Sequence, residues 1–309
     1  MKKIAFVVVW SGKLPNYFPI WLESCKGNPT IDFYVFTDDE TQYNYPFNVK
    51  TVYYSFEELK EKFCDIFPFE ISLDKPYKFC DYKPAYGEAF SSFLEGYDFW
   101  GYCDIDLIWG NIREFLTDKV LEENERIFTR GHCSLFQNNA KVTSYYRTLP
   151  SQGHLDYKMV YQSDKSWCFD EWAKHCGGGI SVIFEENHIP TYDAPVMADI
   201  DVAHGNFHIH RRPDLIRMSY FLYENGNLFA CKKEVGGKIE KESVLYCHFQ
   251  KRNLKVIPGW KREAFMLLPP GEVRAHSDRR GRLTRWLCVR KFDLIVFLKR
   301  IWSRIRAFT

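Results

Sequence analysis

The sequence predicts an α/β fold in which a mixed, mostly parallel β-sheet is flanked by helices and followed by a C-terminal amphipathic helical tail. Apolar, β-rich runs alternate with helical segments from the N-terminus onward. The β-rich run Tyr97–Cys103 ends directly at two acids, Asp104 and Asp106. The C-terminal segment alternates apolar and cationic residues at helical spacing. In a chain of 309 residues we therefore expect one domain over 1–270 and a tail over 271–309.

The first elements along the chain are expected in the order βαββα. Ile4–Trp10 is a continuous apolar run that is typical of a buried strand, and a helix around Tyr17–Cys25 follows it. Two more strands are expected at Ile31–Phe36 and Val49–Tyr54. Ser55–Glu58 contains the serine and the glutamate of a capping box, so the next helix is expected to begin there.

Similar patterns predict the later elements. Lys83–Leu94 has helical periodicity, and Gly96 suits the C-cap of that helix. The segment Asn138–Lys174 is expected to be helical and looped, and Gly177–Gly179 interrupts the chain after it. Further short strands are expected at Ile127–Thr129, Ile180–Phe184, Leu228–Cys231 and Val244–Phe249.

Cysteine usage and targeting signals indicate the cellular compartment. The chain has 10 Cys but no Cys-x-x-Cys pair, which argues against a disulfide framework and against a zinc ribbon. The apolar run Ile4–Trp10 is too short for a signal peptide, and no stretch approaches the ~20 apolar residues of a spanning helix. We therefore expect a reduced, cytoplasmic protein.

The strongest chemical signal is the motif Asp104-Ile105-Asp106, which directly follows a predicted strand. Open α/β sheets bind ligands at the carboxyl ends of their strands. Two carboxylates there can hold Mg²⁺ or Mn²⁺, and the remaining coordination positions can go to a diphosphate. The alternative is a pair of solvated surface carboxylates.

A second signal is His248, which follows the apolar run Val244–Tyr246. A histidine at a strand end can supply a third metal ligand, and the nearby Lys251 can contact a phosphate. Taken alone, His248 would be interpreted as a structural residue. Together with Asp104 and Asp106 it is interpreted as a ligand.

The combination of these motifs resembles the GT-A glycosyltransferases. More closely, the chain resembles a family of glycosyltransferases from bacterial capsule and O-antigen gene clusters. The matching stretches are Ile4–Trp10, Asp32–Asp39, Tyr77–Pro84, Gly101–Asp106, Phe128–His132 and His248-Phe249 with Lys251. The resemblance implies a GT-A-like, Rossmann-like sheet, a nucleotide-sugar donor, and Mn²⁺ or Mg²⁺ as a cofactor.

The resemblance also implies roles for individual residues. Val9, Trp10 and Asp38 would line the base and the ribose of the donor, with UDP as the expected nucleotide. Asp104 and Asp106 would meet the metal and the ribose or diphosphate. The remaining implied ligands are His248 for the metal and Lys251 for a phosphate.

The chain departs from the family after this histidine. Enzymes of the glycogenin and lipopolysaccharide galactosyltransferase type often continue the histidine motif with Lys-Pro-Trp. Here the chain continues with Lys251-Arg252-Asn253, and Pro258-Gly259-Trp260 comes later. The departure leaves open the role of Lys251 and whether the anomeric configuration is retained or inverted.

Two further groups are candidates for binding the donor. Lys78, Asp81 and Lys83 precede a predicted helix, whose N-terminus would suit a diphosphate. The alternative is a solvated turn. Arg130 and His132 follow a short strand after the acidic motif, where contacts to the donor sugar or the acceptor are expected. Here the alternative is a surface turn.

Asp170 is the candidate for the catalytic base that takes the proton of the acceptor hydroxyl, and Glu171 is the second candidate. The alternative is the polar face of a helix. A histidine-rich stretch farther along lacks a recognised metal-ligand spacing, so we interpret it as a loop near the acceptor without a second metal. Its members are His204, His208 and His210, with Asp199 and Asp201 just upstream.

The C-terminal tail is strongly basic. From Gly271 to the end there are eleven cations and three anions, a net charge of +8, so the rest of the chain carries −6. The apolar residues of its predicted helix are Leu283, Trp286, Leu287, Phe292, Leu294, Ile295, Phe297, Leu298, Ile301, Trp302 and Ile305. This pattern is typical of a helix that lies on an anionic membrane surface. The alternative is a helix packed on the domain.

These observations together predict a metal-dependent hexosyltransferase, peripheral on the inner face of a bacterial cell membrane. It would transfer a sugar from a nucleotide-sugar donor to a glycan or lipid-linked glycan acceptor, with no nucleic-acid partner. Two alternatives remain open. A metal-dependent nucleotidyltransferase would need a glycine-rich phosphate loop, for which Ser11-Gly12-Lys13 is a weak match. A membrane-tethered carbohydrate- or polyanion-binding protein would need no metal.

Overall fold

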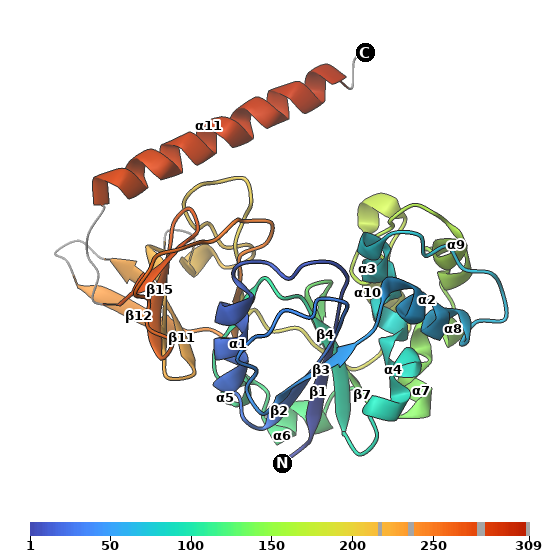
Figure 1. Cartoon of the computed structure of the whole chain (residues 1–309). Coiled ribbons are helices and arrows are strands. Elements are labelled where there is room, and N and C mark those ends of the chain that lie inside the picture. Colours follow the sequence, from blue (N-terminus) through green and yellow to red (C-terminus); the bar gives the residue numbers. More distant parts are fainter. Residues whose placement is uncertain (216–217, 234–237, 277–281, 307–309) are drawn as a thin grey trace. The chain divides into compact units, whose positions relative to one another are not determined.

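The computed structural model describes residues 1–215, 218–233, 238–276 and 282–306. The chain forms two compact units, each assembled from separate stretches of sequence (Figure 1). The first unit consists of Met1–Pro15, Pro29–Ile105 and Leu116–Ala194. The second consists of Asn16–Asn28, Asp106–Phe115 and Pro195–Thr309. The acidic motif is thus divided, since Asp104 belongs to the first unit and Asp106 to the second. The expected domain boundary at residue 270 stays a prediction.

A seven-stranded sheet is the centre of the first unit. Its strands, in spatial order, are β3 (Val49–Tyr53), β2 (Ile31–Thr37), β1 (Ile4–Trp10), β4 (Phe99–Cys103), β7 (Cys133–Gln137), β6 (Arg126–Arg130) and β8 (Thr191–Tyr192). The pairs β3/β2, β2/β1, β1/β4 and β6/β8 are parallel, whereas β7 is antiparallel to both neighbours. This topology confirms the predicted mixed, mostly parallel sheet.

The central position of β1 follows from its composition. Its first five residues, Ile4–Val8, are all buried, and the strand has a parallel neighbour on each side. A strand that is covered on both faces must be apolar along its whole length rather than at alternate positions. The first three predicted strands are confirmed, each within one residue of its expected end.

Short helices cover the sheet of the first unit, and α2, α4 and α7 lie along one side of it (Figure 1). The α-helices are α2 (Phe56–Cys64), α3 (Phe79–Tyr82), α4 (Tyr86–Ala89), α6 (Asp118–Glu122), α7 (Ala140–Thr143), α8 (Tyr145–Thr148), α9 (Tyr157–Gln162) and α10 (Ile180–Glu186). The 3₁₀ turns are η1 (Pro76–Lys78), η2 (Lys83–Ala85), η3 (Ser91–Phe93) and η4 (Lys174–Cys176). The predicted capping box of Ser55 and Glu58 at the start of α2 is confirmed.

Two secondary-structure predictions are wrong. The expected helix Lys83–Leu94 consists of three short turns, because Phe90 leaves the helical region of backbone angles between α4 and η3. The expected strand Ile180–Phe184 is the start of the helix α10. All five of these residues are buried, and a short, fully buried apolar run has the same pattern in a helix and in a strand.

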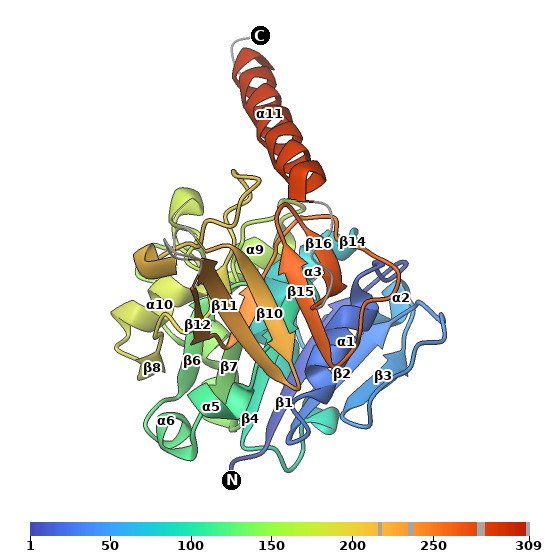
Figure 2. The same cartoon turned by 90° about the vertical axis from the view of Figure 1, so that its left-hand side faces the viewer.

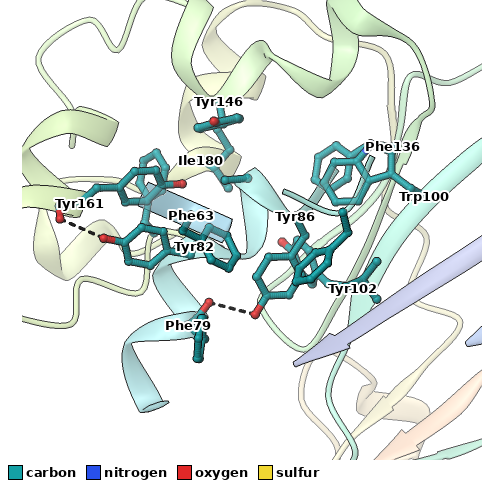
Figure 3. Packing of buried hydrophobic residues seen from close by; sticks show 14 of the residues in the cluster. Phe63, Phe79, Tyr82, Tyr86, Trp100, Tyr102, Phe136, Tyr146, Tyr161 and Ile180 are labelled. Carbon is teal, nitrogen blue, oxygen red and sulfur yellow. Dashed lines mark hydrogen bonds between the residues drawn. The ribbon is translucent and has the colours of Figure 1, made fainter. Parts of the chain in front are cut away.

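Aromatic side chains dominate the core of the first unit (Figure 3). The rings of Tyr82 and Tyr161 are stacked with centroids 4.2 Å apart, and those of Trp100 and Phe136 with centroids 4.8 Å apart. The Tyr82 hydroxyl also donates a 3.0 Å hydrogen bond to the Tyr161 carbonyl. Because a buried tyrosine needs a partner for its hydroxyl, this contact fixes where helix α9 lies.

The described part of the second unit contains two smaller sheets, and Figure 2 shows the larger one. The six-stranded sheet has the order β12 (Ile239–Ser243), β11 (Asn227–Lys233), β10 (Tyr220–Glu224), β15 (Ala264–Leu268), β16 (Glu272–Ala275) and β14 (Lys255–Val256). The three-stranded sheet has the order β5 (Leu107–Trp109), β13 (Tyr246–His248) and β9 (Ala198–Asp199). The helices are α1 (Phe18–Lys26), α5 (Ile112–Phe115), the 3₁₀ turn η5 (Pro213–Leu215) and α11 (Arg282–Arg306).

The helix α11 confirms the predicted helical tail (Figure 1). In the described part of the chain, no helix combines the length and the apolar character that crossing a membrane requires. Large apolar side chains of α11 are exposed, namely Trp286, Leu287, Leu294, Ile295, Phe297, Leu298, Ile301 and Trp302. Asp278, Arg279 and Arg280 of the basic tail lie outside the described residues.

Candidate functional site

In the first unit, a buried lysine holds the first acid of the motif. Asp104 directly follows β4, and its N–H donates to the His132 carbonyl at 3.0 Å. The Lys83 Nζ lies 2.7 Å from Asp104 Oδ1 and 3.2 Å from Asp170 Oδ2, and it donates to the Gly131 carbonyl at 2.6 Å. The structure therefore brings together four residues that were predicted separately from the sequence: Lys83, Asp104, His132 and Asp170.

The charges in this cluster shift the pKa values of its members. Burial lowers the pKa of Lys83, but the carboxylates of Asp104 and Asp170 more than offset this and raise it well above its ordinary value. Burial raises the pKa of Asp170 to about 7, with the nearby Lys83 opposing the shift. A Cβ on Gly131 would lie 2.9 Å from Asp170 Oδ2, so a glycine lets the carboxylate approach this closely.

A second buried ion pair shapes the segment that leads to Asp170. The Asp81 carboxylate accepts hydrogen bonds from the Trp167 N–H at 3.0 Å and the Phe169 N–H at 2.9 Å. The Lys78 Nζ donates to Asp81 Oδ2 at 2.8 Å and also to carbonyls of the chain. Lys78 and Asp81 thus hold the backbone next to Asp170, a role that sequence reasoning missed because the partners are more than 80 residues apart. Their predicted contact with a nucleotide stays a prediction.

The predicted nucleoside residues meet at the carboxyl ends of β1 and β2. Trp10 is the register partner of Thr37, and Asp38 follows β2 directly. Asp38 Oδ1 accepts a 2.6 Å hydrogen bond from the Gly12 N–H, which fastens the loop after β1. Val9 and Trp10 are half-buried. This is the sheet edge at which α/β folds bind ligands.

Arg130 and Glu171 have partners that the sequence did not reveal. Arg130 Nη2 forms an ion pair with Asp193 Oδ2 at 3.3 Å, and the Thr129 hydroxyl donates to the same carboxylate oxygen at 2.9 Å. Glu171 is half-buried, and its carbonyl accepts a hydrogen bond from the Ser181 N–H at 3.3 Å. Asp193 therefore fixes Arg130 next to the cluster around Lys83.

In the second unit, the three-stranded sheet carries a histidine between two carboxylates. Its register places His248 opposite Leu107 on one side and Asp199 on the other. The Phe249 N–H donates to the Asp106 carbonyl at 3.1 Å, which fixes the chain just before β5. His248 Nε2 lies 3.5 Å from Asp106 Oδ1, and His248 Nδ1 lies 2.8 Å from Asp199 Oδ1.

This arrangement fits a divalent ion. Carboxylate and imidazole groups are common ligands of Mn²⁺, and a ligating histidine usually contacts a second carboxylate through its other nitrogen. Asp199 is this second carboxylate, because it contacts His248 Nδ1, and it also accepts a hydrogen bond from Gln250 Nε2 at 2.8 Å. Burial lowers the pKa of His248, but Asp106 and Asp199 raise it overall to about 10. In the absence of an ion, the imidazole thus holds a proton.

The chain itself keeps the two acids of the motif near each other. One residue separates Asp104 from Asp106, so their Cα atoms lie at most about 7 Å apart.

Lys251 follows the histidine segment and is exposed. The remaining histidines of the second unit gather around another carboxylate: His204 and His210 lie 3.8 Å and 3.9 Å from Asp201.

Comparisons with known proteins give one family and several similar structures. Residues 6–275 match the "Family of unknown function (DUF6625)", and the chain belongs to this family. No curated protein matches the sequence.

The similar solved structures include the galactosyltransferase LgtC in complex with donor and acceptor sugar analogues. That match has 13% identity, covers 63% of this chain and 75% of that chain, and has a TM-score of 0.35. Mouse xyloside xylosyltransferase 1 in its apo form is 9% identical, with 64% and 86% coverage and a TM-score of 0.34. The glycosyltransferase GlyE of Streptococcus pneumoniae TIGR4 is 12% identical, with 47% and 37% coverage and a TM-score of 0.26.

Proposed function

We propose that this protein is a metal-dependent hexosyltransferase that transfers a sugar from a nucleotide-diphosphate sugar, with UDP as the expected nucleotide, to a lipid-linked or surface glycan. One observation carries the proposal. A buried histidine lies between the carboxylates of Asp106 and Asp199, and Asp106 belongs to an Asp-x-Asp motif that follows a strand of the main sheet. The resemblance to GT-A glycosyltransferases gives this motif its expected role.

Asp104, Asp106 and His248 would hold Mn²⁺ or Mg²⁺, and Asp199 would orient the imidazole. When bound, the ion would offset the negative charge that develops on the leaving nucleoside diphosphate. The 2.8 Å contact between His248 Nδ1 and Asp199 supports this division, because it leaves Nε2 on the side of Asp106.

Asp170 is our candidate for the group that takes the proton of the acceptor hydroxyl. In the reaction, the acceptor oxygen forms the new glycosidic bond, its proton moves to a carboxylate, and the nucleoside diphosphate leaves with the electrons of the old bond. A general base works best when its pKa is near the working pH, and a value of about 7 supports Asp170. Lys83 would keep this carboxylate in place, and the half-buried Glu171 is the second candidate.

For the donor, we propose that Val9, Trp10 and Asp38 line the nucleoside, which their shared position at one sheet edge supports. Lys251 would meet a phosphate, and its exposure supports this role. The remaining proposed donor contacts are Lys78, Asp81, Lys83, Arg130 and His132.

We further propose that α11 attaches the protein to the inner face of a bacterial cell membrane. Exposed tryptophan, leucine and phenylalanine side chains on a helix within a tail of net charge +8 support a helix in the membrane interface. An acceptor carried on lipid would then be delivered at the same surface.

Calorimetry of UDP, GDP and CMP with and without Mn²⁺ tests the central proposal. The wild type should bind one of these nucleotides only with Mn²⁺, and Asp106→Ala should abolish this binding. Asp65→Ala, which removes an exposed carboxylate at the end of α2, is the matched control and should bind as the wild type does. If no nucleotide binds under any condition, the transferase proposal fails and the metal-independent binding protein becomes the better explanation.

A further inference from the structure

A buried arginine lies four residues after His248. Arg252 is 3% exposed, and in the described ranges its guanidinium donates to three backbone carbonyls. Nη2 donates to Asp201 at 2.7 Å and His204 at 2.6 Å, and Nη1 donates to Pro270 at 2.8 Å. Among the described residues, no carboxylate forms an ion pair with this arginine. The Lys-Pro-Trp that often follows this histidine in enzymes of the glycogenin and lipopolysaccharide galactosyltransferase type has a proline at this place, so the resemblance does not explain Arg252.

The three carbonyls show what this arginine holds. Two of them belong to the segment 201–204, which follows Asp199 at the end of β9. Asp199 is the residue that contacts the imidazole of His248. The ends of β9 and β13 and the segments after them are thus joined by the Asp199–His248 contact, by the hydrogen bond from Gln250 to Asp199 and by the guanidinium. Because the arginine fork has a fixed geometry, it also fixes the spacing of these two segments.

The same arginine contacts the C-terminal helix. Its guanidinium lies 4.8 Å from the ring centroid of Phe292 in α11. The Gly205 N–H donates to Asp293 Oδ1 at 2.6 Å, and Val289 is buried. A Cβ on Gly205 would lie 2.7 Å from the Val289 carbonyl, so the loop and the helix touch backbone to backbone. The part of α11 from Val289 to Asp293, here called its root, therefore docks on the loop that Arg252 holds.

Beyond its root, α11 exposes the apolar side chains that we propose enter a membrane interface. Contact with lipid would fix the position of this helix, and the root would pass that constraint to the loop after Asp199. Holding the loop in advance lowers the entropic cost of ordering Asp199 and His248 around an ion. A coupling of this kind is reciprocal, so ion binding must favour lipid binding by the same factor.

We propose that Arg252 is a positioning residue that couples the metal ligand His248 to α11, so that binding of an anionic lipid surface raises the affinity for the divalent ion. The inference rests on the proposed function. It adds a link between the membrane and the metal ligands of the same site.

Titrating Mn²⁺ into the full chain by calorimetry tests the coupling. Vesicles of equal parts phosphatidylcholine and phosphatidylglycerol should raise the Mn²⁺ affinity of the wild type by at least about fivefold. Vesicles of phosphatidylcholine alone should have no effect. Arg252→Lys should bind Mn²⁺ about tenfold more weakly without vesicles, because lysine cannot bridge the three carbonyls, and should lose the vesicle effect. Arg262→Lys, at an exposed arginine, should behave as the wild type does.

A second variant tests the coupling between lipid and ion binding without changing Arg252, so that a folding defect of Arg252→Lys cannot explain the result. Gly205→Val leaves Arg252 intact but separates the loop from the root, so Mn²⁺ affinity should be normal without vesicles and unchanged by them. Amide hydrogen exchange over 199–210 should slow with anionic vesicles in the wild type and not in this variant. The inference is overturned if anionic vesicles bind the wild type without changing its Mn²⁺ affinity, or if both variants keep the full effect. If the wild type binds no Mn²⁺ even with nucleotide, the proposed function fails instead.

Discussion

At the scale of single residues, His248 shows how the ligands of the proposed metal site are arranged by their own contacts. Two carboxylates contact its two ring nitrogens, and they raise its pKa to about 10 although burial acts in the opposite direction. The protonated imidazole stabilises the ion-free fold fully when the pH is below 6.5, the ordinary pKa of histidine. This stabilisation is lost as the pH rises through about 10, the pKa of His248 in the fold. A metal must displace the proton, since only the neutral imidazole can ligate.

We therefore expect the apparent Mn²⁺ affinity to rise with pH, by up to about tenfold per unit below the pKa of His248. Asp199→Asn removes one of the two carboxylates, so it should lower that pKa and flatten the dependence near neutral pH. Calorimetric titrations in buffers of different ionisation enthalpy would also count the protons released on binding. An affinity that stays constant from about pH 6 to 8 would speak against a protonated His248 in the ion-free protein.

Lys83 provides a second prediction at the residue scale. Its ammonium neutralises Asp104 and the buried Asp170, so Lys83→Met leaves two carboxylates without their cation. Removing one member of a buried ion pair typically costs about 3–5 kcal/mol of unfolding free energy, to be measured here by urea denaturation. Lys119→Met removes an exposed lysine whose pair with Glu123 spans 3.9 Å, and should change stability by less than about 1 kcal/mol. Equal effects of the two substitutions would contradict this account of the cluster.

At the scale of elements, the local sequence pattern predicted the secondary structure correctly where the pattern is compatible with only one type of element. The continuous apolar run of β1 and the capping box before α2 both specify their structures without reference to distant residues. The segment Ile180–Phe184 does not, because an apolar run of five buried residues suits a strand as well as a helix. Tertiary contacts decide between strand and helix here. The Ile180 N–H donates to the Phe169 carbonyl, a contact that no local pattern reveals.

The start of α10 yields a prediction that links this element to the candidate base. The Gly179 N–H donates to the Trp172 carbonyl at 2.8 Å, and a Cβ on Gly179 would lie 2.2 Å from the Glu171 carbonyl oxygen. Gly179→Ala should therefore cost about 1–3 kcal/mol in unfolding free energy by urea denaturation. It should also displace the neighbouring Asp170. Glu185→Ala, an exposed position in the same helix, should stay within about 0.5 kcal/mol. A fully stable Gly179→Ala would refute the close approach.

At the scale of the whole molecule, pairings between distant segments limited what the sequence could predict. Sequence reasoning expected only two of the strands in the second unit, namely β11 and β13. Local hairpins such as β10 and β11 could have been found from their turn residues, whereas the pairings of β10 with β15 and of β13 with β5 join segments far apart in the chain. The same limit applies to the site. His248 and Asp106 were expected as ligands from their local motifs, whereas Asp199 was grouped with the neighbouring histidines. Its contact with His248 follows from the register of β9 and β13, 49 residues apart.

The distribution of charge over the molecule leads to the last prediction. If α11 lies in a membrane interface, both its cations and its apolar side chains contribute to binding, and these contributions can be separated in a vesicle co-sedimentation assay. Leu294 and Leu298 are 57% and 52% exposed, and each leucine buried in lipid contributes about 1.5–3 kcal/mol. Leu294→Asp with Leu298→Asp should therefore weaken binding to anionic vesicles by more than about tenfold. The double variant Ser91→Asp with Gln162→Asp changes the net charge equally at exposed positions outside the helix and should bind almost normally. If both double variants lose the same small fraction of binding, and salt abolishes the remainder, the tail acts through charge alone. That result would favour the polyanion-binding alternative over a helix inserted in the membrane interface.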